Sequence, residues 1–349
     1  MDKIPKIIIY GAGAIGGTLG GFLSNKFDNI FLLARGEHAK VMKEKGLILY
    51  EMDPEQKKHI DVNVIESLDE ESDADVIIIV VKNYNLEEVA EDIKNKATNN
   101  PVIMSFQNGA ENQKILPKYI KKIIFGVLWF GAWRDKPGVI GCEPTRPITM
   151  GILNDDSEAK ETMSKINNIF QQADIESEIV ENFQDAVHAK IIFNITNALL
   201  TLIGHGFRDI ENISKLRKIT VNLLTEGIDI VKAAGYNEFI RGENHPTWRL
   251  LKIAKHLPGF ITNKIFLNFI NNVNLNSMAQ DVITIQRDQT ELDSINGYLL
   301  KLAEKHGIDA PYNRALYRAC KEKFSEPEFK PMTEEELWMK TKEILKNKQ

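Results

Sequence analysis

The sequence has few of the features that define several other classes of protein. Only two of its 349 residues are cysteines, Cys142 and Cys320, and there is no CxxC pair. A disulfide framework is therefore excluded, and we expect a protein of the reducing cytoplasm. No apolar run approaches the length of a membrane span, and no signal peptide precedes the first apolar segment, so no membrane partner is expected.

Concentrated positive charge is also missing. The chain has 44 Lys and Arg against 49 Asp and Glu, a net charge of −5 without a long basic block, which argues against nucleic acid as a partner. The seven histidines are scattered without metal-ligand spacing, so we predict no metal site and expect surface or satisfied structural histidines. The remaining composition, 43% hydrophobic and 27% charged, is that of a globular protein long enough for two domains.

The most informative feature that is present lies near the N-terminus. An apolar run at residues 6–10 leads directly into Gly11-Ala12-Gly13-Ala14-Ile15-Gly16. Gly11 allows a tight turn, Gly13 lets the backbone approach a pyrophosphate, and Gly16 lets a helix pack close to the strand. The phosphates would lie at the helix N-terminus, whose N–H groups attract anions. The pattern predicts a dinucleotide site; the alternative is a glycine-rich turn that binds nothing.

The next strand predicts which dinucleotide binds. Residues 30–34 form a second buried strand that ends in Arg35, where an NAD-preferring site usually places an acidic residue to bind the ribose 2′-hydroxyl. A guanidinium favours a 2′-phosphate instead. Lys82, after the apolar segment 76–81, would add a second positive charge at the same edge. We predict NADPH rather than NADH, with two ordinary strand-end charges as the alternative.

Strands alternate with helices in the first half, which predicts a Rossmann-type parallel sheet. The expected strands are 6–10, 30–34, 76–81, 102–105 and 123–128, then a hairpin of 139–140 with 148–151 near a turn at Pro137-Gly138, a helix at 157–171 and a last strand at 176–180. Only helical periods follow. The predicted fold class is α/β: a Rossmann-type dinucleotide-binding domain at residues 1–182 and an all-helical substrate and catalytic domain at 183–349, with a catalytic cleft between them.

Residues 186–200 predict a helix that is apolar on nearly every side and therefore buried. Lys190, Asn194 and Asn197 are the main exceptions, and their spacing puts them on one stripe. Each buried amide would cost roughly 1–3 kcal/mol if left unpaired, so something polar must face the stripe. We interpret the stripe as the lining of a site for a polar, anionic substrate, where burial would lower the pKa of Lys190 toward the range useful for proton donation. A structural ion pair of Lys190 is the alternative.

Three further residues are candidates on weaker grounds. Asn108, in Gln107-Asn108-Gly109, directly follows a strand and so lies at the ligand side of the sheet, although an Asn-Gly turn explains it equally well. Glu291 borders the apolar stripe of a later helix, and Ser277 could donate a hydroxyl to a carboxylate. Spacing alone does not establish a role for either.

Together these segments resemble the ketopantoate reductase (2-dehydropantoate 2-reductase) family over nearly the whole chain. The motifs that carry the resemblance are Gly11–Gly17, Ala34-Arg35-Gly36, Gly46-Leu47, Lys82, Gln107-Asn108-Gly109, Lys190 with Asn194, Ser277-Met278-x-Gln280-Asp281, Thr290-Glu291-Leu292-Asp293 and Ile295-Asn296-Gly297. The resemblance implies NADPH-dependent reduction of ketopantoate to pantoate, a step of pantothenate and coenzyme A biosynthesis.

The resemblance also implies roles for single residues. Arg35 and Lys82 would hold the 2′-phosphate, and Asn108 would sit between cofactor and substrate. Lys190 would protonate the developing alkoxide and Glu291 would bind the substrate hydroxyl. The polar end of the substrate would be held by Ser277 and Asn194.

The chain departs from the family at two places. In the family a second amide commonly follows the first, here Asn194, after four residues; that position is Ala198 in this chain, and Asn197 lies one residue earlier. The segment 281–290 is also two residues longer than is usual in the family. Two other enzymatic functions therefore remain as alternatives: reduction of another small 2-oxo acid, and the reaction of an opine-type dehydrogenase. A nucleotide-sensing regulatory protein is the non-enzymatic alternative, although a sensor needs neither Lys190 nor Glu291. The expected partner is a small 2-oxo acid; a homodimer is compatible with the sequence, which does not fix the oligomeric state.

Overall fold

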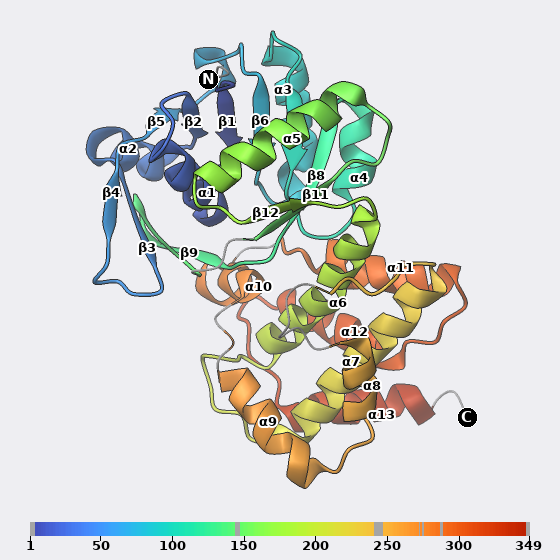
Figure 1. The fold of residues 1–349 in the computed structure, drawn as a ribbon. Helices are drawn as coiled ribbons and strands as arrows, with labels where there is room; N and C mark the ends of the chain where they lie inside the picture. The colour runs from blue at the N-terminus through green and yellow to red at the C-terminus, as the bar shows by residue number, and fades with distance from the viewer. Residues whose placement is uncertain are drawn as a thin grey trace. The chain divides into compact units, whose positions relative to one another are not determined.

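The computed structural model describes residues 4–143, 147–240, 247–271, 273, 276–286 and 289–346. The chain divides into two compact units, Met1–Phe183 and Gln184–Gln349. The first is an α/β unit with a Rossmann-type sheet and the second is helical, which confirms the predicted fold class (Figure 1). Among the described residues, no helix is both long and apolar enough to cross a membrane.

A sheet of eight strands forms the centre of the first unit. Its order is β12-β11-β8-β7-β6-β1-β2-β5, and the strands from β8 to β5 are mutually parallel. The central strands are apolar at nearly every position because both faces of the sheet are covered. The strands are β1 (Ile7–Tyr10), β2 (Ile30–Leu33), β5 (Asn63–Ile65), β6 (Val76–Ile79), β7 (Val102–Ser105), β8 (Ile123–Leu128), β11 (Ile148–Gly151) and β12 (Ser177–Ile179).

The predicted hairpin of 139–140 with 148–151 is wrong. Strand β11 pairs antiparallel with β8 and parallel with β12, so the large sheet is not entirely parallel. Strand β10 (Val139–Cys142) belongs instead to a second sheet of order β4-β3-β10-β9. The turn at Pro137-Gly138 exists, but it joins β10 to β9 (Ala132–Lys136). Strands β9, β3 (Leu47–Glu51) and β4 (Lys58–Ile60) were not predicted. In β9 and β4, exposed charged residues interrupt the apolar pattern that marks a buried strand.

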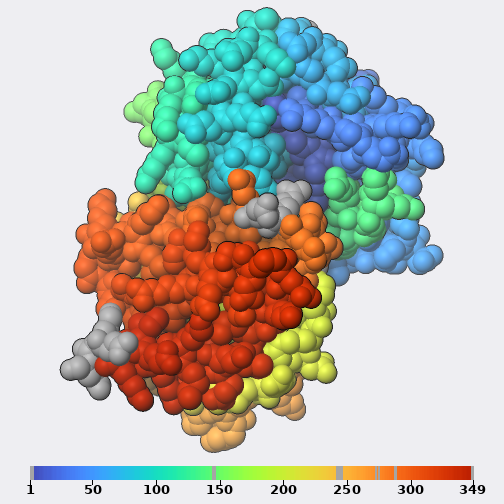
Figure 2. Space-filling view, turned by 180° about the vertical axis from the view of Figure 1, so that it is seen from behind, coloured from blue at the N-terminus to red at the C-terminus, as the bar shows by residue number. Residues whose placement is uncertain are grey.

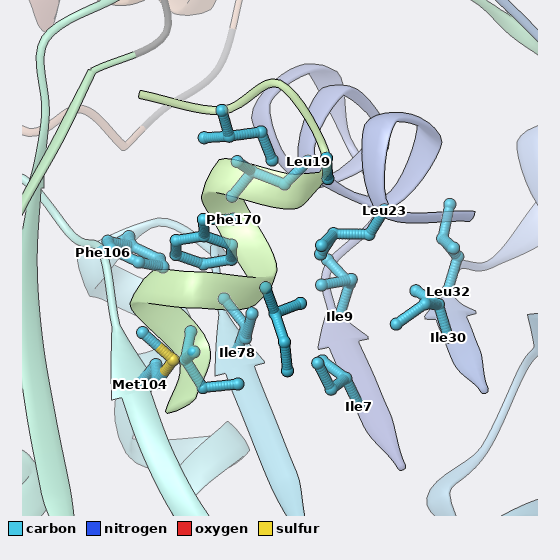
Figure 3. Close-up of a cluster of buried hydrophobic side chains, with 14 of the residues drawn as sticks. Ile7, Ile9, Leu19, Leu23, Ile30, Leu32, Ile78, Met104, Phe106 and Phe170 are labelled. Carbon is cyan, nitrogen blue, oxygen red and sulfur yellow. The ribbon is translucent and has the colours of Figure 1, made fainter. Parts of the chain in front are cut away.

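Helices cover both faces of the large sheet. On one face, α1 (Ala14–Ser24) and α5 (Ser157–Gln172) contribute Leu19, Leu23 and Phe170 to a buried cluster with β1, β2, β6 and β7 (Figure 3). Burial of each such side chain stabilises the fold by about 1.5–3 kcal/mol. On the other face, α3 (Leu86–Lys96) buries one apolar side, and its Asp92 accepts a hydrogen bond of 2.8 Å from the Tyr10 hydroxyl. Two shorter helices are α2 (Gly36–Lys45) and α4 (Asn112–Ile115).

The second unit is built around α6 (Phe183–Leu202), which is buried on most sides as predicted. Gly204, Gly235 and Pro258-Gly259 lie at the breaks between its helices. Figure 2 shows that the last part of the chain forms much of one face of this unit. The other helices are α7 (Ile213–Ala233), α8 (Trp248–Ala254), α9 (Gly259–Asn271), α10 (Ser277–Ala279), α11 (Tyr298–Lys305), α12 (Pro311–Phe324) and α13 (Glu334–Lys346), with π-helical turns at Gln280–Thr284 and Asp293–Gly297.

Candidate functional site

The glycine loop between β1 and α1 has the geometry that the sequence predicts. Gly11 has a φ of +102°, and a Cβ there would lie 2.7 Å from Val81 Cγ1. A Cβ at Gly16 would lie 2.2 Å from the carbonyl oxygen of Gly11, so the helix can approach the turn only without a side chain. A Cβ at Gly13 would meet nothing within 4 Å. Gly11 and Gly16 are therefore needed for the turn and the packing, while Gly13 faces open space.

The N-terminus of α1 is suited to an anion. No described side chain caps the helix and its first turn holds no acidic residue. The N–H groups of residues 14–16 have no acceptor within the helix, as in the first turn of any helix. The loop before them is pinned to β2, because the amides of Gly11 and Ala12 donate to the carbonyl of Leu33 at 3.2 and 2.9 Å. A pyrophosphate fits this rigid, uncapped end.

Arg35 and Lys82 lie at the carboxyl edge of the sheet, on either side of the glycine loop. Arg35 is exposed at the N-cap of α2, directly after β2, whereas the half-buried Lys82 follows β6. Since β1 lies between β2 and β6, these two strand ends are about 10 Å apart. The predicted strand 76–81 stops at Ile79, and Val81 instead packs against the glycine turn. Both cations thus border the ligand side of the sheet, and the nearby acidic residue, Glu37, is exposed.

A buried amide holds the ends of β6 and β7 together. Gln107 Nε2 donates to the carbonyls of Ile79 at 2.9 Å and Val81 at 3.1 Å. The Ser105 hydroxyl donates to Gln107 Oε1 at 2.5 Å. Gln107 is therefore a positioning residue for this edge, a role that the sequence analysis missed although the residue stands in a quoted motif. The signal was a polar side chain directly after a buried strand.

Asn108 is half-buried at the same edge. Its carbonyl oxygen accepts a hydrogen bond of 2.6 Å from Nδ2 of the buried Asn83, and Gly109 follows with a φ of +86°. The backbone of Asn108 is therefore fixed to the segment that follows Lys82. Asn83 is a second positioning residue that the sequence analysis did not single out.

In the helical unit, α6 carries the predicted polar stripe. Asn194 is buried with 7% of its surface exposed, and Lys190 and Asn197 are half-buried. Ile191 and Ile195 beside them are fully buried. Lys190 and Asn194 are not without partners, since each takes part in at least one further interaction within the protein.

Asn276 brings the Ser277 segment to α6. Its Nδ2 donates to the carbonyl of Asn197 at 3.4 Å, and its Oδ1 accepts from the Thr201 hydroxyl at 3.2 Å. The same oxygen caps α10 by accepting from the amide of Ala279 at 2.9 Å. Ser277, half-buried, thus begins a helix fixed to the end of the stripe. The sequence analysis missed Asn276, although Asn is a preferred N-cap residue.

Asn296 brings the Glu291 segment to the same helix. Its Nδ2 donates to the carbonyl of Ile195 at 3.2 Å, and only 1% of the residue is exposed. Glu291 is itself buried, with 5% exposed, and its carbonyl accepts from the amide of Ile295 at 3.1 Å at the start of this turn. The segments that hold Ser277 and Glu291 therefore both hydrogen-bond to the backbone of α6 beside the stripe. Within the longer segment 281–290, residues 287 and 288 lie outside the described residues.

The buried His188 on α6 has a hydrogen-bond partner at each ring nitrogen. It is 1% exposed, its Nδ1 lies 2.8 Å from the carbonyl of Gln184, and its Nε2 lies 2.8 Å from the Tyr298 hydroxyl. The ring stacks on Tyr236 at 3.6 Å. Burial lowers the pKa of His188 to about 4. It is a satisfied structural residue that joins α6 to α11.

We expect the free energy of unfolding to fall as the pH falls below about 6.5. The pKa of His188 is about 4 in the folded protein, against an ordinary histidine value of 6.5. Between these values the unfolded state binds more protons than the folded state, so lowering the pH stabilises the unfolded state relative to the folded one. The full effect is about 3 kcal/mol. Urea unfolding of wild type and His188→Gln between pH 7 and pH 4 isolates it, because the variant should lose less stability. An identical loss in both proteins would contradict the assignment.

Two family models cover most of the chain. Residues 7–155 match the family described as Ketopantoate reductase PanE/ApbA, and residues 182–324 match its C-terminal family, Ketopantoate reductase PanE/ApbA C terminal. The chain belongs to the ketopantoate reductase family. The resemblance seen in the sequence is thereby confirmed, and the protein is an oxidoreductase with a Rossmann-type dinucleotide-binding unit.

Curated relatives of the family align over nearly their whole length. The 2-dehydropantoate 2-reductase of Pyrococcus abyssi is 27% identical over 91% of this chain and 97% of the relative, and that of Lactococcus lactis is 25% identical over 88% and 94%. Among solved structures, a ketopantoate reductase from Ralstonia eutropha has a TM-score of 0.71 at 20% identity and covers 92% of this chain and 99% of its own. D-mandelate dehydrogenase with NADH and anilino(oxo)acetate has a TM-score of 0.73 at 21% identity, covering 91% and 98%. These structures share the fold.

Proposed function

We propose that this protein reduces 2-dehydropantoate to pantoate with NADPH, a cytoplasmic step in pantothenate and coenzyme A biosynthesis. The observation that carries the proposal is the arrangement around α6. Lys190, Asn194 and Asn197 lie on this buried helix, and the Ser277 and Glu291 segments are bonded to its backbone. The curated relatives that are named 2-dehydropantoate 2-reductase support the same substrate.

In the proposed mechanism Lys190 is the general acid. Reduction of a ketone places negative charge on its oxygen, and the Nζ ammonium hydrogen-bonds to that oxygen, stabilises the charge and then transfers a proton to it. Glu291 accepts a hydrogen bond from the hydroxyl of the substrate. Ser277 and Asn194 bind its polar end, with Asn197 next to them on the stripe. When bound, the nicotinamide of the cofactor would supply the hydride from its C4.

NADPH is the proposed cofactor because the glycine loop and both cations fit it. The uncapped N-terminus of α1 at Gly13–Gly16 receives the pyrophosphate, and Arg35 and Lys82 border it with positive charge suited to a 2′-phosphate. Asn108, whose carbonyl is fixed at the same edge, would contact the ribose or the substrate in this proposal.

The test is a panel of 2-oxo acids assayed with purified protein while NADPH absorbance is followed. The proposal expects the highest kcat/KM with 2-dehydropantoate. Faster turnover of another 2-oxo acid would show that the proposed substrate is wrong, while the proposed type of reaction would stand. No turnover of any 2-oxo acid, with tight NADPH binding, would favour a sensor.

A reductase of a different small 2-oxo acid is the second candidate. Ala198 is fully buried where the family commonly has a second amide on the stripe, and Asn197 is half-buried beside it. The polar end of the substrate would thus meet a changed set of groups. The likeness to D-mandelate dehydrogenase, a structure that holds anilino(oxo)acetate, supports this class of substrate.

Glu291→Ala should impair substrate use far more than cofactor binding. In the proposed mechanism the buried carboxylate accepts a hydrogen bond from the substrate hydroxyl, and the variant loses it. A hydrogen bond to a charged group contributes about 1.5–3 kcal/mol. Steady-state kinetics should show a lower kcat/KM with unchanged NADPH affinity. Asp293→Ala is the matched control, since this nearby carboxylate bonds Tyr317 at 2.6 Å and Lys321 at 3.2 Å on an exposed surface. If wild type and Glu291→Ala have the same kcat and KM, Glu291 has only a structural role.

A further inference from the structure

His38 is a buried titratable residue that the proposed chemistry does not use. It lies in the first turn of α2, soon after Arg35, with 6% of its surface exposed. Its Nε2 lies 2.8 Å from the carbonyl oxygen of Ala12 in the glycine loop, and its Nδ1 accepts a hydrogen bond of 2.9 Å from the amide of Gly138. One ring therefore connects the glycine loop, α2 and the β9–β10 turn.

These two contacts determine where the ring carries its proton. Because the Gly138 N–H donates to Nδ1, the neutral ring has its proton on Nε2 and donates it to the Ala12 carbonyl. A second proton, on Nδ1, would point at the Gly138 N–H and break that bond. Burial lowers the pKa of His38, and the charge of Arg134 on β9 lowers it further. The charged groups on its own helix are all exposed: Glu37, Lys40, Lys43, Glu44 and Lys45.

We infer that His38 is a positioning residue for dinucleotide binding. Its imidazole fixes the glycine loop against the first turn of α2. The loop leads to the N–H groups that would receive the pyrophosphate, and Arg35, at the N-cap of α2, would bind the 2′-phosphate in the proposed cofactor site. The imidazole thus sets the distance between the two halves of the cofactor site before the cofactor arrives. The link to Arg35 rests on the proposed preference for NADPH; the link to the loop rests only on dinucleotide binding.

The test compares wild type, His38→Ala and His38→Gln by calorimetric titration of the full chain with NADPH and with NADH. His38→Ala leaves the Ala12 carbonyl and the Gly138 amide without this partner, so we expect about tenfold weaker binding of both cofactors and a changed ratio of their affinities. His38→Gln should restore most of the affinity, because its amide accepts from Gly138 and donates to Ala12. His59→Ala is the matched control: this exposed histidine bonds the Lys45 carbonyl at 2.6 Å, at the other end of α2, and its loss should leave binding unchanged.

A pH profile separates positioning from a structural role. NAD⁺ is the probe, since it lacks the 2′-phosphate, which would itself titrate near pH 6. Because burial lowers the pKa of His38, wild type should lose affinity for NAD⁺ only at pH values below the ordinary histidine range, whereas His38→Gln should not. Equal pH profiles, or wild-type affinity in His38→Ala, would overturn the inference. If His38→Ala binds both cofactors more weakly but keeps the ratio of NADPH to NADH affinity, only the link to Arg35 is overturned. If wild type shows no preference for NADPH, the proposed function is contradicted, and the pH profile with NAD⁺ still decides the role of His38.

Discussion

Lys190→Ala should lower kcat by about 10²–10⁴-fold while the protein still folds and binds NADPH. Lys190 is half-buried on the polar stripe of a helix whose other residues are largely buried and apolar. A charge that is partly withdrawn from water acts at a lower effective dielectric constant. In the proposed mechanism the ammonium of Lys190 would stabilise the charge on the substrate oxygen more strongly than water would. The glycine loop is on the other unit of the chain, so the affinity for NADPH should be unchanged. Steady-state kinetics beside calorimetric binding of NADPH measures both quantities.

Lys190→Arg is the matched variant. A guanidinium keeps the positive charge but does not release its proton in proteins. We therefore expect a KM near that of wild type with a kcat nearly as low as in Lys190→Ala. A kcat of Lys190→Ala close to wild type would remove Lys190 from the mechanism. Loss of folding in both variants would instead support a structural ion pair.

Arg35→Ala should reduce the preference for NADPH over NADH. The guanidinium is exposed at the N-cap of α2, where an acidic residue would select NAD. Losing a charge-assisted contact should cost roughly 1.5–3 kcal/mol of NADPH binding, about 10- to 150-fold in Kd, and leave NADH binding nearly unchanged. Dissociation constants of both cofactors for wild type and variant give the comparison.

Lys40→Ala serves as the control for Arg35, because Lys40 is an exposed cation on the same helix. Its removal changes the net charge equally but should leave the ratio of NADPH to NADH affinity as it is. If wild type binds the two cofactors equally well, or if Lys40→Ala has the same effect as Arg35→Ala, then Arg35 does not recognise the 2′-phosphate.

Much of the fold could be predicted from local patterns. The strands at 102–105 and 123–128 were predicted with the observed ends, because continuous apolar runs between polar segments indicate buried parallel strands. The spacing of Gly11 and Gly16 predicted a turn and a close packing that the structure shows directly. The apolar sequence of α6 likewise predicted its burial.

The second sheet could not be predicted, because its pairings are non-local. Strand β10 pairs in parallel with β3, from a part of the chain far earlier in sequence, and short strands of mixed polarity carry no periodic signal. The same holds for His38, whose partners Ala12 and Gly138 lie in distant segments. Asn276 and Asn296 act through α6 backbone carbonyls, which a sequence does not mark as acceptors.

The most direct test of the proposed reaction follows the hydride itself. Purified protein is incubated with 2-dehydropantoate and NADPH that carries deuterium at both C4 positions of the nicotinamide, and the product is analysed by mass spectrometry. The proposal predicts pantoate with a single deuterium on its carbinol carbon, formed by wild type and only at a trace rate by Lys190→Ala. Absence of pantoate, or pantoate without deuterium, would contradict it.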